Sequence, residues 1–91
     1  MAIGVYFPVS GMTSQQYDDV IKKLQAAGLG SPKGRVYHAS FGEPNNLMVF
    51  DVWSSQAEFD AFGTVLMPIL GSSGVTPPTP QIMPIHNVIK P

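Results

Sequence analysis

The chain of 91 residues contains no cysteine, which excludes disulfides, thiolate metal sites and cysteine nucleophiles. Charge is also scarce: only 12% of the residues are charged, and five basic against six acidic residues give a net charge of −1. A chain with this charge balance lacks the excess of basic residues that is typical of nucleic-acid-binding proteins. The N-terminal stretch lacks a basic lead and a long apolar run, so neither a signal peptide nor a membrane span is expected. We therefore expect a cytoplasmic protein without nucleic-acid or membrane partners.

Two kinds of cofactor motif are missing as well. The two histidines and the acids show none of the spacings HxH, HxxxH or HExxH, so no metal site is predicted. No glycine-rich loop follows a strand and opens a helix, so a nucleotide cofactor is not indicated either. The sequence predicts a protein that works without a cofactor.

What the sequence does contain is a regular alternation of apolar patterns, which predicts six elements. Strands are expected at residues 2–9, 35–41, 47–53 and 81–90, and helices at residues 13–27 and 55–70. Thr13 with Gln16, and Ser55 with Glu58, have the spacing of capping boxes at the two helix starts. Pro68 predicts a kink or a looser last turn in the second helix. Residues 71–80, rich in Gly, Ser and Pro, are expected to form a long ordered loop.

The order β-α-β-β-α-β predicts one α+β domain over residues 1–91 with a ferredoxin-like fold, in which two helices cover one face of a four-stranded antiparallel sheet. Every predicted strand carries apolar side chains on both faces, so the second face also needs cover. A second copy of the same sheet is the simplest cover. We therefore expect a homodimer with a closed space between two facing sheets.

The turn at residues 42–46 sets the pairing of the second and third strands, with Phe41 opposite Met48. This register puts two sets of side chains on opposite faces, since alternate residues share a face. One set, expected under the helices, is Met48, Phe50 and Val52, with Phe59 and Phe62 from the second helix. The other, expected to face the space between subunits, is Val36, His38, Ser40, Val49, Asp51 and Trp53. A slip of one residue would exchange the two sets.

The stretch at residues 51–59, DVWSSQAEF, has the order acid-x-Trp, Ser, acid-aromatic. With this motif and its element order, the whole chain resembles the dimeric α+β barrel superfamily, which includes antibiotic biosynthesis monooxygenase-type domains. The resemblance implies a cavity on the face opposite the helices, bordered by Asp51 and Trp53, and activity as a cofactor-independent oxygenase of polycyclic aromatic compounds. Haem-degrading members use an Asn on strand one and a His on helix two, which this chain lacks, so haem degradation is not expected.

His38 and Asp51 are the predicted catalytic residues, because a carboxylate beside an imidazole fixes its tautomer and raises its basicity. In this hypothesis His38 is a general base, Asp51 orients it and Trp53 stacks on the ligand. The further predicted ligand-binding residues are Tyr6, Val36, Val49 and His86. Each residue also has a structural interpretation: His38 and Asp51 as a self-satisfied buried pair, and Trp53 as a core or interface anchor.

Two functions remain open from the sequence. One is a small dimeric barrel that binds an apolar or aromatic molecule and performs cofactor-independent monooxygenase-like chemistry on it. The alternative is a non-catalytic ligand-sensing or protein-interaction module. An open cavity with His38 and Trp53 on its wall would favour the first function over the second.

Overall fold

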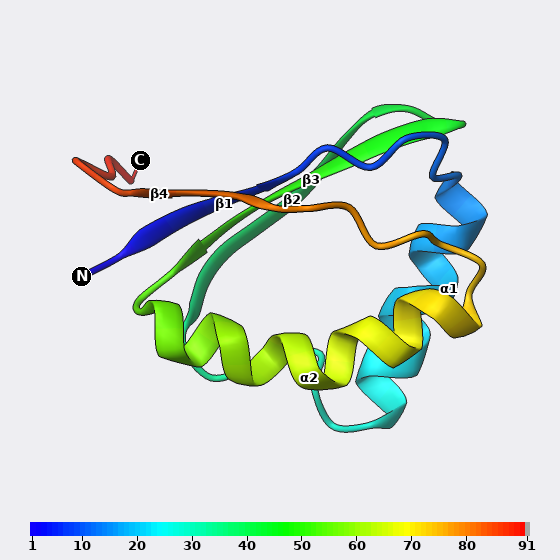
Figure 1. The fold of residues 1–91 in the computed structure, drawn as a ribbon, viewed down its shortest axis with the longest axis horizontal. Helices are drawn as coiled ribbons and strands as arrows, with labels where there is room; N and C mark the ends of the chain where they lie inside the picture. The colour runs from blue at the N-terminus through cyan, green and yellow to red at the C-terminus, as the bar shows by residue number, and fades with distance from the viewer. Residues whose placement is uncertain (91) are drawn as a thin grey trace.

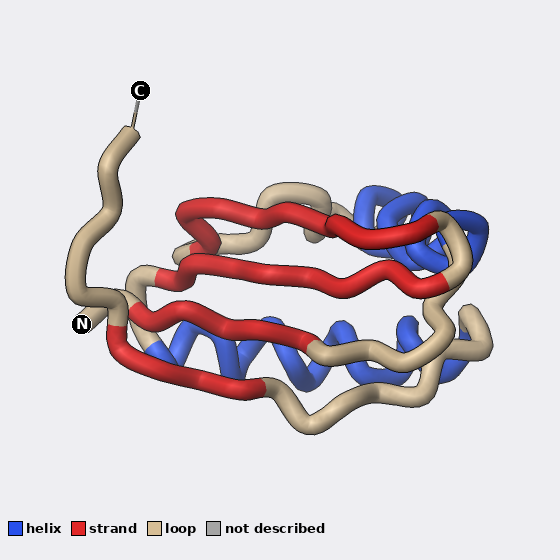
Figure 2. Tube along the Cα trace, turned by 90° about the horizontal axis from the view of Figure 1, so that it is seen from above, coloured by secondary structure: helices blue, strands red, loops and turns tan. Residues whose placement is uncertain are grey.

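The computed structural model describes residues 1–90 and shows six elements in the order β-α-β-β-α-β. They are β1 (Ile3–Phe7), α1 (Ser14–Ala26), β2 (Arg35–Glu43), β3 (Asn46–Trp53), α2 (Gln56–Ser72) and β4 (Gln81–Pro84). The four strands form one antiparallel sheet in the order β2-β3-β1-β4 (Figure 2). Both helices lie on the same side of this sheet (Figure 1). The predicted ferredoxin-like α+β fold is confirmed.

Helix α1 begins and ends where the sequence indicates. The Thr13 hydroxyl accepts from the Gln16 amide and the Gln16 side chain accepts from the Thr13 amide, which completes the predicted capping box. At the other end Gly28 adopts a φ of 78°, and the Leu29 amide donates to the Leu24 carbonyl at 2.8 Å. This is a Schellman-type stop, which needs a left-handed residue where only glycine is free of strain.

Helix α2 starts at the Ser55 cap, whose hydroxyl accepts from the Glu58 amide. The Glu58 carboxylate accepts from the hydroxyls of Ser54 and Ser55, so only the first half of the predicted capping box forms here. The helix also continues through Pro68 to Ser72, two residues further than predicted. Proline removes one amide donor, and a helix of this length tolerates that loss where its neighbours stay bonded. No helix within residues 1–90 is long and apolar enough to cross a membrane.

Strand β4 is shorter than predicted. It ends at Pro84, which pairs with Ile3, and the Ile85 amide makes one further bond to the Ala2 carbonyl at 2.9 Å. β1 begins at Ile3, so the strand pairing with β4 ends there as well. Residues 86–90 lie beyond the sheet (Figure 2), and residues 87–90 line a hollow on the open face together with Tyr37, Phe50 and Val52.

The predicted register of β2 and β3 is confirmed, with Phe41 opposite Met48 and His38 opposite Asp51. The assignment of the two faces is wrong. Asp51 and Trp53 point towards the helices, not away from them, and the Trp53 ring lies 5.2 Å from the Phe62 ring. The set expected under the helices (Met48, Phe50 and Val52) lies on the open face.

Pairing with β1 explains the inverted faces. Ile3 pairs with Trp53, Val5 with Asp51 and Phe7 with Val49. The three β1 residues are all buried under the helices, and the only side chain opposite them on the other face is Tyr6 flanked by Gly4. The face that shares Ile3, Val5 and Phe7 is thus the more apolar one and takes the helices. Asp51 is tolerated there because hydrogen bonds satisfy it.

A β-bulge near the start of β2 changes the position of Val36. Tyr37 pairs with Val52 and Arg35 with Trp53, so Val36 is the extra residue between two paired ones. It was predicted to share a face with His38. The bulge turns it outward instead, where it is 48% exposed beside the open face.

Candidate functional site

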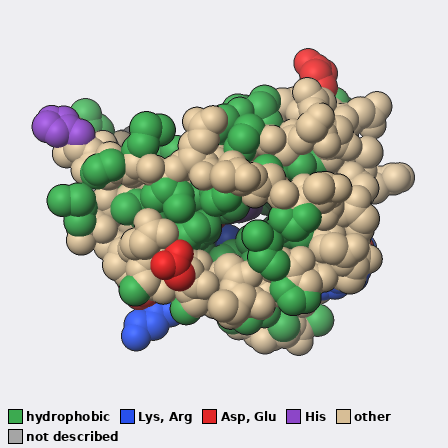
Figure 3. Space-filling view, viewed as in Figure 1, with side chains coloured by type: hydrophobic (Ala, Val, Ile, Leu, Met, Phe, Trp, Pro, Cys, Tyr) green, Lys and Arg blue, Asp and Glu red, His purple; other side chains and the backbone are tan. Residues whose placement is uncertain are grey.

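The pocket of interest lies between the sheet and the helices of one chain, not between two sheets. Its enclosed part has a volume of about 60 Å³ and is lined mainly by apolar side chains from β1, β3 and both helices. A second hollow of about 370 Å³ lies between α2 and the loop at residues 77–80, and Phe7, Leu66, Leu70 and Pro78 line both. Figure 3 shows the molecule hollowed near its centre, with hydrophobic side chains around the opening. The earlier expectation that a partner subunit must enclose the site is wrong.

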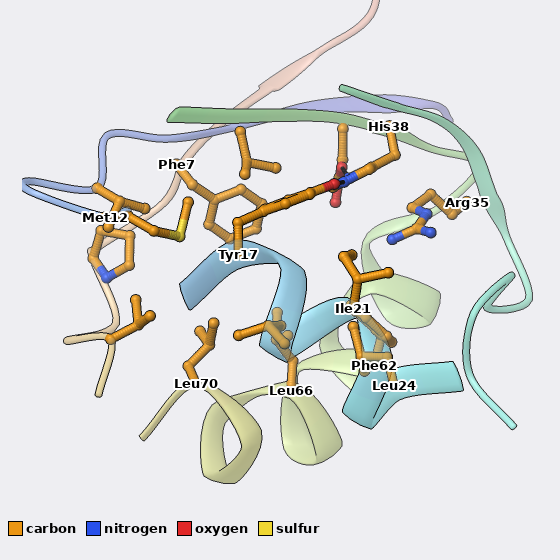
Figure 4. Close-up of a pocket in the computed structure, with 16 residues that line it drawn as sticks. Phe7, Met12, Tyr17, Ile21, Leu24, Arg35, His38, Phe62, Leu66 and Leu70 are labelled. Atoms are coloured by element: carbon orange, nitrogen blue, oxygen red, sulfur yellow. Dashed lines mark hydrogen bonds and ion pairs between the residues drawn. The ribbon is translucent and has the colours of Figure 1, made fainter. Parts of the chain in front are cut away.

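One chain of hydrogen bonds supplies the polar part of the pocket wall. Asp51 Oδ1 lies 2.6 Å from His38 Nδ1, and His38 Nε2 lies 2.6 Å from the Tyr17 hydroxyl. Tyr17 comes from α1, His38 from β2 and Asp51 from β3. Figure 4 shows the side chains of Tyr17 and His38 pointing toward each other between the sheet and the helices. The predicted pairing of His38 with Asp51 is therefore present in the structure.

The direction of these hydrogen bonds follows from the groups themselves. Asp51 is only 3% exposed, and its second oxygen accepts the Trp53 indole N–H at 3.2 Å. An ionised carboxylate can only accept, so a neutral His38 carries its proton on Nδ1 and donates it to Asp51. Nε2 is then an acceptor and the Tyr17 hydroxyl donates to it. A basic nitrogen thus faces the pocket beside a phenol that can pass on a proton.

Trp53 does not stack on a ligand in this arrangement. Its side chain is fully buried, packs against Phe59 and Phe62, and is absent from the pocket wall. The role that the structure gives it is support of the Asp51 carboxylate through the indole N–H. The predicted stacking role would require the ring to leave the core.

Of the four remaining predicted ligand-binding residues, one lines the pocket and three do not. Val49 lines the pocket next to His38 and Asp51. Tyr6 lies on the open face, where its hydroxyl donates to the Met48 sulfur at 2.8 Å. Val36 is turned outward by the bulge, and His86 is exposed beyond the end of β4. These three residues therefore lie outside the pocket.

Tyr17 and Arg35 are the two polar pocket residues that sequence reasoning missed. Tyr17 lies one and two turns before the buried Val20 and Leu24 of α1 and packs against the core. A tyrosine on the buried side of a helix needs a partner for its hydroxyl, which is the signal that could have revealed it. Arg35 stood at a predicted strand start. Its guanidinium lies over the Phe62 ring, 5.9 Å from the centroid, and lines the pocket (Figure 4). Within the described chain no group of three or more His, Asp or Glu side chains is placed to hold a metal ion.

No family model matches the sequence, and no protein with a curated description is similar to it. Solved structures are similar to the whole chain. SnoaB of Streptomyces nogalater, a cofactor-independent oxygenase, is 17% identical with a TM-score of 0.58, over 97% of this chain and 94% of that one. A Streptomyces coelicolor monooxygenase from the gene ActVA-Orf6, solved with nanaomycin D, is 17% identical with a TM-score of 0.57, over 99% and 90%.

A candidate antibiotic biosynthesis monooxygenase of Deinococcus radiodurans is 12% identical with a TM-score of 0.64, over 99% of this chain and 97% of that one. At such identities the likeness concerns the backbone and not the site. The chain therefore has the ferredoxin-like fold that is shared by structures of the antibiotic biosynthesis monooxygenase type.

Proposed function

We propose that the protein binds an apolar hydroxyaromatic molecule and oxidises it with dioxygen, without a cofactor. The observation that carries the proposal is the Tyr17–His38–Asp51 hydrogen-bond chain, which places an imidazole on the wall of a mainly apolar pocket. A structural neighbour that works as a cofactor-independent oxygenase adds support through the shared fold.

His38 and Tyr17 would remove a proton from the substrate. A substrate hydroxyl at the Tyr17 position donates to His38 Nε2, directly or through the Tyr17 hydroxyl, and Asp51 stabilises the imidazolium that forms. The apolar wall leaves the resulting aryloxide poorly solvated, so its electrons are available to dioxygen. For 1-naphthol the reaction balances as C₁₀H₈O + O₂ → C₁₀H₆O₂ + H₂O: one oxygen atom enters the quinone and the other leaves as water.

The dimensions of the pocket restrict how such a substrate binds. A cavity of about 150 Å³ is known to accept benzene, and the enclosed part here has only about 60 Å³. The second hollow, beside α2, has about 370 Å³. A ring system that reaches His38 therefore requires the apolar side chains around this small pocket to move apart.

We also propose that a second copy of the chain covers the open face of the sheet. Tyr37, Phe41 and Met83 are 56%, 45% and 60% exposed there, and Phe41 stacks on Tyr6. Burying these side chains sheet against sheet would remove a continuous apolar surface from water. Light scattering should give twice the monomer mass for the wild type and the monomer mass for Phe41→Asp. Val65→Asp, a similar change at an exposed residue of α2, should remain dimeric.

Oxygen uptake and quinone absorbance with 1-naphthol test the catalytic proposal. His38→Gln should lower turnover at least about 100-fold, the usual contribution of a positioned base. His86→Gln, which removes the exposed histidine outside the pocket, should leave turnover unchanged. If the wild type binds 1-naphthol by calorimetry but takes up no oxygen, catalysis is wrong and the non-catalytic binding module replaces it.

A further inference from the structure

Arg35 is a cation on the wall of a mainly apolar pocket, and within residues 1–90 no acidic side chain forms an ion pair with it. The ion pairs found there are Lys23 with Asp19 and His38 with Asp51. The guanidinium makes one hydrogen bond, from Nη2 to the Gly30 carbonyl at 3.1 Å, and otherwise lies over the Phe62 ring. Arg35 is half-buried and this bond is exposed, so the other four N–H groups, which have no partner among the described residues, are open to solvent and to a ligand.

The backbone is shaped so that this cation faces the pocket. In a regular strand Arg35 and His38 would lie on opposite faces, because they are three residues apart. The bulge at Val36 inserts one residue and brings Arg35 opposite Trp53, on the face that His38 and Asp51 share. Without the bulge, Val36 would line the pocket and Arg35 would point to solvent. The bulge thus puts the charged Arg35 at the pocket wall in place of the apolar Val36, an arrangement that suits an anionic ligand.

We infer that Arg35 binds the carboxylate of an aromatic acid, so that the preferred substrate is a hydroxyaryl carboxylate. This inference rests on the proposed function for the role of His38. Guanidinium and carboxylate match as two parallel hydrogen bonds, and Arg is the side chain suited to that geometry. Asp51 also lines this pocket, but its two carboxylate oxygens accept from His38 and Trp53, so it offers no hydrogen-bond partner to Arg35.

The spacing along β2 limits the shape of the acid. Three residues of strand span about 10 Å at most, and the bulge shortens this distance. Figure 4 shows Tyr17 and Arg35 on either side of His38. The hydroxyl that meets His38 and the carboxylate that meets Arg35 therefore stand at opposite ends of one or two fused rings. 5-Hydroxy-2-naphthoate has this shape: it is 1-naphthol with a carboxylate on the second ring.

Calorimetric titration with 5-hydroxy-2-naphthoate and its methyl ester tests the inference, because the two differ only in charge. The wild type should bind the acid about 10- to 100-fold more tightly than the ester. Arg35→Gln should abolish this preference by weakening the acid while the ester keeps its affinity. Lys22→Gln, which removes an exposed positive charge on α1, should retain the preference. A merely structural role of Arg35 would weaken both ligands equally, so the ratio separates the two roles.

Equal binding of acid and ester by the wild type, binding of neither, or a preference that survives in Arg35→Gln would each overturn the carboxylate subsite. Oxygen uptake then distinguishes the two proposals. Arg35-dependent binding of the acid without turnover leaves the subsite standing and refutes the oxygenase function. Turnover of the acid and the ester with equal kcat/KM supports the oxygenase function and refutes the carboxylate subsite.

Discussion

Replacement of Asp51 by Asn should move the proton of His38 from one ring nitrogen to the other. In the wild type the Asp51 carboxylate accepts from both His38 Nδ1 and the Trp53 indole, and neither donor has another partner in the core. An amide of the same shape has one accepting oxygen and one donating nitrogen. If its oxygen keeps the bond to Trp53, its N–H₂ group faces His38 Nδ1, which must then become an acceptor. The proton moves to Nε2, where it points at Tyr17.

The move of the proton to Nε2 should lower both the turnover and the stability of the protein. Turnover should fall about 10²- to 10⁴-fold, because the nitrogen that faces the pocket is no longer a base. Stability should fall by about 1–3 kcal/mol, because two charge-assisted hydrogen bonds become ordinary ones. In a chain of this length each kcal/mol corresponds to roughly 4–8 °C in Tm.

Long-range ¹⁵N–¹H spectra of the imidazoles measure the tautomer without any substrate. The chain has only two histidines, so a His86→Gln variant assigns the spectrum. Asp18→Asn, the same chemical change at an exposed position of α1, serves as the control and should leave the His38 signals in place. A wild-type His38 protonated on Nε2, or an Asp51→Asn protein that keeps its proton on Nδ1, would refute the hydrogen-bond chain.

Three further changes test the framework around the pocket by thermal unfolding. Gly34→Ala should cost at least about 1–2 kcal/mol, since Gly34 has a φ of 91° and a Cβ there would lie 2.5 Å from the Glu58 carboxyl carbon; an unchanged Tm would contradict this. Hydrogen bonds from Ser54 and Ser55 hold the pKa of Glu58 below its ordinary value of 4.5, so its contribution to stability is complete above pH 4.5 and is lost as the pH falls through the lowered pKa. Glu58→Gln should therefore lower Tm at neutral pH and match the wild type in strong acid, whereas a pH-independent difference would argue against the ionised carboxylate. Trp53→Phe should cost about 1–3 kcal/mol, because it leaves a void and removes the N–H donor to the buried carboxylate; a variant of normal stability with weakened ligand binding would favour the stacking role.

The sequence predicted the fold because its signals are local. Capping at Thr13 and Ser55, the stop at Gly28 and the turn after Phe41 fix where elements begin, end and reverse. With those boundaries the order of elements leaves few topologies. The length of β4 was not predictable in this way. Its end depends on where its partner β1 runs out, which is a property of the pairing and not of the C-terminal residues.

The pairing of His38 with Asp51 was also predictable, whereas the face on which they lie was not. The register of β2 and β3 follows from the turn, but the more apolar face is decided by Ile3, Val5 and Phe7 of β1, and no turn sets the pairing of β1 with β3. The resemblance implied a cavity opposite the helices, bordered by Asp51 and Trp53. The pair lies under the helices instead, because a carboxylate with two donors, His38 and Trp53, is satisfied inside the core.

The bulge at Val36 could not be predicted from the sequence, and it decides which residue of β2 lines the pocket. Alternation along β2 assigns Val36 to the pocket and Arg35 to solvent, and one inserted residue reverses both assignments. Nothing in the letters Arg35-Val36-Tyr37 marks a bulge, because the extra residue is neither a glycine nor a turn former. Regular pairing would have put Val36 on the pocket wall and exposed Arg35, which is the usual arrangement of an apolar and a charged residue around a core. The strand instead exposes Val36 and places the half-buried Arg35 beside Phe62, where the positive charge is accessible to the negatively charged ligand that we propose.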